Sequence, residues 1–230
     1  MAINLYDLAA ADGRRFSPYC WRAKMALAHK GLAFETKPTP FTAIRSICGG
    51  GEKSVPVIED RGRVVRDSFD IALYLEEAYP DRPTLFGGEG GKATARFVES
   101  WANGTLHPQL ITLCVKDIHD ALTEDDKVYF RENREKRFGR SLEAVQEGRE
   151  SRLDAARQAL APLRATLQRQ PFIGGERPLF VDYIVFGSLQ WPRVVSSFRI
   201  PAEDDPVRDW FERCLDLHGG LGRDAPAAAA

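Results

Sequence analysis

The feature of the sequence that most constrains the fold is the segment 79–91, where two prolines and four glycines fall within thirteen positions. Such a composition is typical of a linker. Before it, residues 1–78 alternate short apolar strand patterns with helical ones. After it, residues 92–230 show helical patterns only, apart from an alanine-rich tail. We therefore predict a small α/β domain, a linker and an all-helical domain.

The α/β domain is expected to contain four strands and three helices. The strands are expected at residues 3–6, 33–37, 55–59 and 63–66, and the helices at 17–29, 41–47 and 69–78. The tripeptide Pro38-Thr39-Pro40 is expected to end pairing of the second strand, because proline cannot donate to a ladder. Asp60-Arg61-Gly62 predicts a hairpin turn, and Asp67-Ser68 predicts the cap of the last helix.

The helical domain is expected to begin with one long helix at residues 92–120. Further helices are predicted after Thr123, from Ser141, and at 147–170, 180–196 and 206–217. Residues 180–196 form the most apolar of these segments, so we expect them at the centre of the second domain's core.

The composition excludes several classes of function. A formal net charge of −1 gives no support for nucleic acid or an acidic membrane as a partner. The sequence shows neither an apolar run of membrane-spanning length nor the pattern of a signal peptide, so a cytoplasmic protein is expected. The four cysteines are widely spaced and predicted to be free thiols, and no histidine pair has the spacing of a metal site, so no metal is predicted.

The candidate site begins at the stretch Phe16-Ser17-Pro18-Tyr19-Cys20-Trp21-Arg22, which follows the first strand and opens the first helix. Unpaired backbone N–H groups and the helix dipole favour an anion there, and a thiolate is an anion. The Ser17 hydroxyl either caps the helix or donates to such a thiolate, and the two roles are compatible. Tyr19 either assists the thiolate or packs against its neighbours.

Val55-Pro56 is the second feature with chemical meaning. A cis bond here would turn the strand and present the backbone of Val55 sideways, where an extended peptide can pair with it as an added strand. A trans proline at a strand start is the alternative, and trans is the commoner isomer for X–Pro bonds at roughly nineteen in twenty.

Together, Ser17-Pro18-Tyr19, Val55-Pro56 and Asp67-Ser68 resemble the thioredoxin-type half of a glutathione transferase. Residues 92–223 resemble the all-helical half of that family, so the resemblance covers nearly the whole chain. It implies a thioredoxin-like α/β domain, an all-α domain and a homodimer. Three stretches are similar to the bacterial β-etherase subgroup, which cleaves aryl ethers of lignin fragments with glutathione: residues 17–22, 134–138 and 204–210.

The resemblance implies how the sulfur of glutathione is held. Ser17 takes the place of the residue that contacts this sulfur, and Val55, next to a cis Pro56, pairs by its backbone with the cysteinyl part. A thiol of the cysteine type titrates near pH 8.5, so lowering its pKa by about two units requires ~3 kcal/mol. A hydroxyl donor and a helix N-terminus are able to supply that in a partly dry site.

The resemblance also implies how the two ends of glutathione are held. Asp67 and Ser68 would hold the amine and the carboxylate of the γ-glutamyl end. Lys53 would reach the glycine carboxylate, although a plain surface lysine is an equal alternative. The chemistry agrees, because a helix N-terminus holds a carboxylate and an aspartate complements an ammonium group.

Other residues near these motifs have two readings. A substrate pocket is expected between the domains, and four side chains either line it or belong to the core: Phe97, Trp101, His107 and Trp191. Cys20 lacks a partner cysteine three residues earlier, so a two-cysteine redox cycle is excluded and a buried thiol is expected. Arg22 either lines the site or is paired structurally, and the basic run at 127–140 is expected to be a solvated helix face.

One position departs from the family pattern. The core helix of the family opens with Ser or Thr followed three residues later by Asp. Here Asp182 is present but Leu179 occupies the cap position. The missing half of this capping box predicts a loss of ~1 kcal/mol of helix stability.

The resemblance thus implies an enzyme that activates glutathione for attack on a hydrophobic, aromatic electrophile, with β-aryl ether cleavage as the preferred reaction. Two alternatives remain. One is a general detoxifying conjugator or weak peroxidase with a broad pocket. The other is a non-catalytic member of the family that binds a ligand or a partner.

Overall fold

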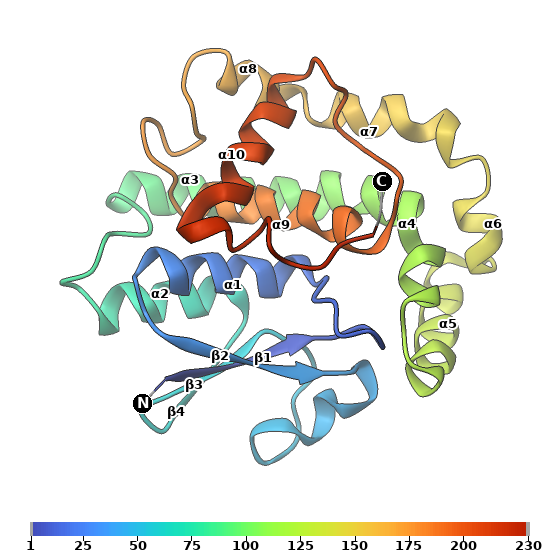
Figure 1. Cartoon of the computed structure of the whole chain (residues 1–230), viewed down its shortest axis with the longest axis horizontal. Helices are drawn as coiled ribbons and strands as arrows, with labels where there is room; N and C mark the ends of the chain where they lie inside the picture. Colours follow the sequence, from blue (N-terminus) through green and yellow to red (C-terminus); the bar gives the residue numbers. More distant parts are fainter. Residues whose placement is uncertain (1, 229–230) are drawn as a thin grey trace.

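The computed structural model describes residues 2–228 and divides them into an α/β part and a helical part (Figure 1). The α/β part runs β1 (Ile3–Leu8), α1 (Pro18–His29), β2 (Phe34–Thr39), the 3₁₀ segment η1 (Phe41–Gly49), β3 (Val57–Asp60), β4 (Arg63–Arg66) and α2 (Ser68–Ala78). The strands form one sheet in the order β2-β1-β3-β4, with β1 parallel to β2 and the other pairs antiparallel. The predicted α/β fold class is confirmed.

The second strand is longer than predicted. It continues through Pro38, which lies opposite Asp7 in the parallel register of β1 and β2. The expectation that Pro38 would end the pairing was wrong because β2 lies at the edge of the sheet, where a missing N–H on the outer side costs no ladder bond. The third strand begins at Val57 rather than at Val55, directly after a cis Val55–Pro56 bond.

The helical part begins at α3 (Glu89–Trp101), inside the segment expected to be the linker. It continues through the π-helical turn η2 (Ala102–Leu106) into α4 (His107–Asp120). The remaining elements are α5 (Glu124–Phe138), α6 (Leu142–Gln146), η3 (Arg149–Arg152), α7 (Leu153–Ala159), α8 (Ala161–Leu167), α9 (Phe180–Val195) and α10 (Pro206–Gly220). The helix expected at 147–170 is broken into pieces. Gly148 adopts a left-handed conformation at its start, and Pro162 begins a new helix within it.

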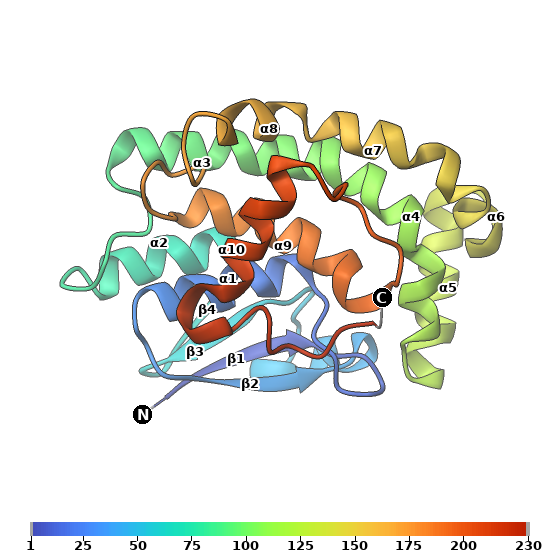
Figure 2. The ribbon, with the colours of Figure 1, turned by 45° about the horizontal axis from the view of Figure 1, so that its top comes forward.

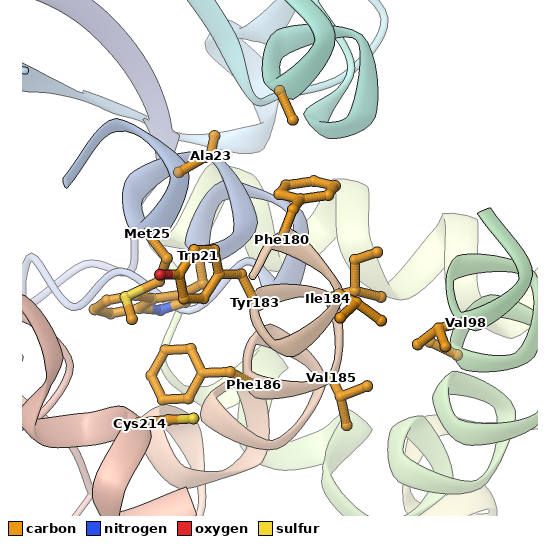
Figure 3. Packing of buried hydrophobic residues seen from close by; sticks show 14 of the residues in the cluster. Trp21, Ala23, Met25, Val98, Phe180, Tyr183, Ile184, Val185, Phe186 and Cys214 are labelled. Atoms are coloured by element: carbon orange, nitrogen blue, oxygen red, sulfur yellow. The ribbon is translucent and has the colours of Figure 1, made fainter. Parts of the chain in front are cut away.

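Helix α9 lies at the centre of the helical part and packs along α1, as Figures 1 and 2 show. In Figure 3, Trp21 and Met25 of α1 face Tyr183 and Phe186 of α9 across this interface. The rings of Trp21 and Phe186 meet edge to face with their centroids 6.0 Å apart. The buried apolar residues form two clusters, and each contains residues of both parts, so the two domains pack against each other through their apolar interiors.

The start of α9 is held by Asp182. Its carboxylate accepts from the backbone N–H groups of Ile173, Gly174 and Leu179 and from the indole N–H of Trp210, over 2.7–3.0 Å. Leu179 has no side-chain hydrogen bond, so one half of the capping box is absent as the sequence indicated. Asp182 compensates by binding the preceding loop as well as the helix start.

Candidate functional site

Ser17 opens α1 and lies almost wholly buried. It is the N-cap residue, and its Oγ accepts from the backbone N–H of Cys20 at 3.3 Å. The cap reading of Ser17 is therefore confirmed. Because the hydroxyl accepts this bond, its own proton remains free to be donated to an anion above the helix start. Pro18 occupies the first turn, where its missing N–H costs nothing.

A cavity of about 450 Å³ opens beside Ser17, between the two domains, where the sequence predicted a pocket. Four of the predicted site residues line this cavity: Ser17, Tyr19, Lys53 and Val55. Pro56, Asp67 and Ser68 do not line it.

Asp67 and Ser68 lie at the start of α2. Asp67 is the N-cap residue, with φ +63°, and its Oδ1 accepts from the backbone N–H groups of Phe69 at 2.7 Å and Asp70 at 3.3 Å. The Ser68 hydroxyl is buried and has no hydrogen-bond partner within residues 2–228. A buried donor without a partner at a helix N-terminus is suited to a carboxylate.

Tyr19 begins a chain of polar groups that leads from the cavity wall into the interior. Its hydroxyl lies 3.2 Å from Nδ1 of His107, whose Nε2 lies 2.9 Å from Oγ of Ser188. The Ser188 hydroxyl donates to the backbone carbonyl of Ile184, so Oγ accepts from His107 and Nε2 carries the imidazole proton. Burial lowers the pKa of His107 to about 3, which keeps the ring neutral. Tyr19 therefore donates its proton to Nδ1, and burial raises the pKa of Tyr19.

Arg22 belongs to the support of the site, not to its lining. The side chain is fully buried, and its guanidinium lies 3.3 Å from the carboxylate of Glu99 and 3.1 Å from the side-chain oxygen of Asn103. It also stacks on the ring of Tyr19, 4.6 Å from the ring centroid. Of the two readings of Arg22, the structural pairing is confirmed.

Cys20 is buried, as predicted, and burial raises the pKa of its thiol. A thiol of that kind stays protonated at neutral pH and is a poor nucleophile.

The far wall of the cavity comes from α4, α5 and α9. His107 and Trp191 line it, as one reading of the sequence allowed. Trp101 packs against the apolar core instead, and Phe97 is 74% exposed on α3. Sequence analysis missed the contribution of α5, which supplies Tyr129, Phe130, Asn133, Arg134, Arg137 and Phe138.

The basic run at 127–140 is thus only partly a solvated face. Arg131 is ion-paired with Glu135 and Glu143 on the outer side, but Arg134 and Arg137 line the cavity. The signal that could have located this inner face is the spacing of Phe130, Arg134 and Arg137, because residues three and four apart share one side of a helix.

Neither a metal cluster nor a membrane helix is found in the part of the chain that the structure covers. No group of three His, Cys, Asp or Glu side chains there is arranged to hold a metal ion. Across residues 2–228, the helices are too short or too polar to span a bilayer.

Comparison with known proteins places this geometry in a class of protein. The family model described as "Glutathione S-transferase, C-terminal domain" matches residues 93–217, and the model "Glutathione S-transferase, N-terminal domain" matches residues 13–83. The chain belongs to the glutathione S-transferase family, and glutathione is the co-substrate of that family. The α/β and helical parts together form the fold that the resemblance implied.

Individual relatives are distant. A "Glutathione S-transferase-like protein ustS" of Aspergillus flavus is 27% identical over 219 residues, covering 82% of this chain and 78% of that protein. The crystal structure of glutathione transferase GSTFuA3 from Phanerochaete chrysosporium is 28% identical, with a TM-score of 0.77 over 96% of this chain and 92% of that one. A glutathione S-transferase of Ceriporiopsis subvermispora, solved in complex with glutathione, is 22% identical with a TM-score of 0.79 over 99% of this chain and 100% of that one. At that identity it supports the fold alone.

Proposed function

We propose that this protein is a glutathione transferase that activates the thiol of glutathione at Ser17 and directs it at a hydrophobic, aromatic electrophile. The observation that carries the proposal is the cavity between the domains. One side of it holds the buried Ser17 at a helix start and Val55, and the other side includes aromatic rings of α5 and α9.

Each predicted residue has a part in this proposal. Ser17 donates to the thiolate, and the backbone of Val55, preceding cis Pro56, pairs with the cysteinyl part of glutathione. Asp67 and Ser68 receive the γ-glutamyl end, which agrees with the unpartnered Ser68 hydroxyl. Lys53 receives the glycine carboxylate.

The reaction is a nucleophilic displacement. The thiolate attacks an electrophilic carbon, a carbon–sulfur bond forms, and the bond from that carbon to the leaving group breaks with its electron pair. With an aryl ether as substrate, a phenolate leaves and takes up a proton from solvent. We propose this β-aryl ether cleavage as the specific reaction on the similarity of residues 17–22, 134–138 and 204–210 to the β-etherase subgroup.

The thiol pKa of bound glutathione tests the role of Ser17. Following thiolate absorbance against pH should give a pKa below that of free glutathione. Ser17→Ala should raise the bound pKa by about one to two units, the equivalent of one lost charge-assisted hydrogen bond of ~1.5–3 kcal/mol. Ser46→Ala, at an exposed serine of η1, is the matched control and should leave the value unchanged. An unchanged pKa in the Ser17 variant would leave that residue a cap only.

The choice of reaction is tested with substrates. An aryl ether ketone supplied with glutathione should release its phenol. Ready conjugation of a simple haloarene, without phenol release from several such ethers, would instead favour the general conjugator or peroxidase. An absence of glutathione binding would favour the non-catalytic ligand-binding alternative.

The homodimer and the cytoplasmic location are part of the same proposal. Light scattering after gel filtration should give twice the chain mass of 25.7 kDa.

A further inference from the structure

The cavity carries a charge that the proposed reaction does not use. Three of its lining side chains are cationic, namely Lys53, Arg134 and Arg137, and none of its lining residues is Asp or Glu. With Lys53 assigned to the glycine carboxylate of glutathione, two guanidinium groups remain on the α5 side.

These two arginines have no acidic partner among residues 2–228. The side chains of Arg134 and Arg137 form no ion pair there, and Arg134 has a single hydrogen bond, to the side-chain oxygen of Asn133. Arg131, one turn earlier on the same helix, is by contrast paired with Glu135 and Glu143. Glu135, the carboxylate next to Arg134 on α5, is therefore committed to Arg131, and no acidic residue lines the cavity.

The environment of Arg134 makes an anion favourable. The side chain is half-buried, with its guanidinium 4.9 Å from the ring centroid of Phe130. Burial and the neighbouring charge of Arg137 lower the pKa of Arg134, although an arginine remains charged at neutral pH. A bound carboxylate would relieve the repulsion between the two guanidiniums and replace the water that Arg134 has lost.

The arginines come from a different element than the lysine assigned to the glycine end of glutathione. Arg134 and Arg137 belong to α5, which forms part of the far wall of the cavity. Lys53 enters from the loop between η1 and β3. The lining of the cavity also includes the apolar and aromatic side chains of Ile111, Phe138 and Trp191.

We infer that the second substrate is an aromatic compound carrying a carboxylate, which Arg134 and Arg137 bind while its ring lies against the aromatic wall. This inference rests on the proposed function, because binding of the carboxylate by the arginines would place the electrophilic carbon of the substrate next to the thiolate of glutathione. It makes the two arginines determinants of specificity.

A matched pair of haloarenes tests the inference. 4-Chloro-3,5-dinitrobenzoate and 4-chloro-3,5-dinitrobenzamide carry the same leaving group and differ in charge. The wild-type protein should have the higher kcat/KM with the benzoate, chiefly through a lower KM. Arg134→Gln and Arg137→Gln should each reduce the benzoate-to-benzamide ratio at least fivefold and change kcat/KM for the benzamide less than twofold.

The control variant is Lys136→Gln, which removes one positive charge from an exposed position of the same helix that does not line the cavity. It should keep the wild-type ratio. Added salt should reduce the wild-type preference, since a partly exposed ion pair is screened. An unchanged ratio in both arginine variants would overturn the inference. So would a rise in KM for glutathione that is equal with both substrates, because the arginines would then bind the glycine carboxylate.

A binding measurement separates this inference from the proposed function. 3,5-Dinitrobenzoate and 3,5-dinitrobenzamide have no leaving group, and their binding is measured by quenching of tryptophan fluorescence. Tighter binding of the benzoate, lost in the arginine variants, would support the anion site even if the protein conjugates neither haloarene. Equal binding of the two compounds by the wild-type protein would overturn it even if conjugation is fast.

Discussion

At the scale of single residues, the two hydroxyls beside the cavity differ in where their protons go. Ser17 accepts from the backbone of Cys20, a bond that does not use its own proton, whereas Tyr19 donates to His107. If Ser17 activates the thiol of glutathione as proposed, this difference predicts a larger effect of Ser17 than of Tyr19 on the thiol pKa. The sequence placed both residues at the helix start but could not rank them, because the partner of Tyr19 is 88 positions away.

Tyr19→Phe tests this ranking. The substitution removes a proton that is already donated to His107, so the pKa of bound glutathione should shift less than it does in Ser17→Ala. Titration of thiolate absorbance in both variants measures the two shifts. A larger shift in Tyr19→Phe would mean that its hydroxyl turns from His107 to the sulfur when glutathione binds.

His107 should make the stability of the fold depend on pH. Its pKa is about 3 in the folded chain, against about 6.5 when unfolded, because burial disfavours the charged ring. Below pH 6.5 the unfolded state binds the extra proton, so stability falls as the pH drops toward 3. Between pH 7 and pH 5 the loss from this one group should be about 2 kcal/mol.

Denaturant unfolding at pH 7 and pH 5 measures that loss. His107→Gln retains a donor and an acceptor but cannot be protonated, so it should show a smaller difference between the two pH values. His119→Gln is the control, because His119 contacts the carboxylate of Asp120 near the surface and should leave the acid loss in place. If both variants lose the same stability on acidification, His107 is not its source.

At the scale of elements, α5 is fastened to the α/β domain by one buried carboxylate. Asp126, fully buried, accepts from the backbone N–H groups of Phe41 and Thr42 at 2.7 and 2.8 Å and from the Thr42 hydroxyl at 2.8 Å. These bonds join the start of η1 to α5. The cavity wall that bears Arg134 therefore depends on a contact between the domains.

Asp126→Ala should loosen that wall. It leaves two backbone donors unpaired at a buried contact, for a cost of about 1–3 kcal/mol in the free energy of unfolding. KM for the proposed aromatic substrate should rise as well, because α5 supplies much of the cavity wall that is proposed to bind it. Asp125→Ala alters the exposed neighbouring carboxylate in the same turn and should show neither effect. Equal stability of the two variants would contradict the role given to Asp126.

The elements also show which features of the fold local sequence pattern can predict and which it cannot. Strand and helix types in residues 1–78 follow from alternation, turns and caps, which are local. The extension of β2 through Pro38 depends on its place at the sheet edge, and sequence pattern does not give that place. Arg134 is half-buried and Arg137 is exposed, and both line the cavity because of where α5 docks, which the charge run alone does not indicate.

At the scale of the whole molecule, the division into an α/β part and a helical part was predictable from the segment 79–91, because glycine and proline punctuate a chain locally. The close packing of the two parts was not predictable, because it depends on complementary surfaces formed by residues that are distant in sequence. A single glycine of α9 fixes that closeness. A Cβ built at Gly187 would lie 2.3 Å from the carbonyl oxygen of Pro18, at the start of α1.

Gly187→Ala should therefore act on stability and on chemistry together. The methyl group would force α9 away from the start of α1, and overpacking of this kind costs about 1–3 kcal/mol in the free energy of unfolding. Because Pro18 follows Ser17, the displacement should also raise the pKa of bound glutathione. Gly90→Ala, in the exposed first turn of α3 with no atom within 4 Å of the new methyl group, is the matched control and should be neutral or slightly stabilising. Denaturant unfolding and thiol titration of both variants measure the two effects. A destabilised Gly187 variant with an unchanged thiol pKa would show that the start of α1 holds the sulfur of glutathione independently of the helical domain.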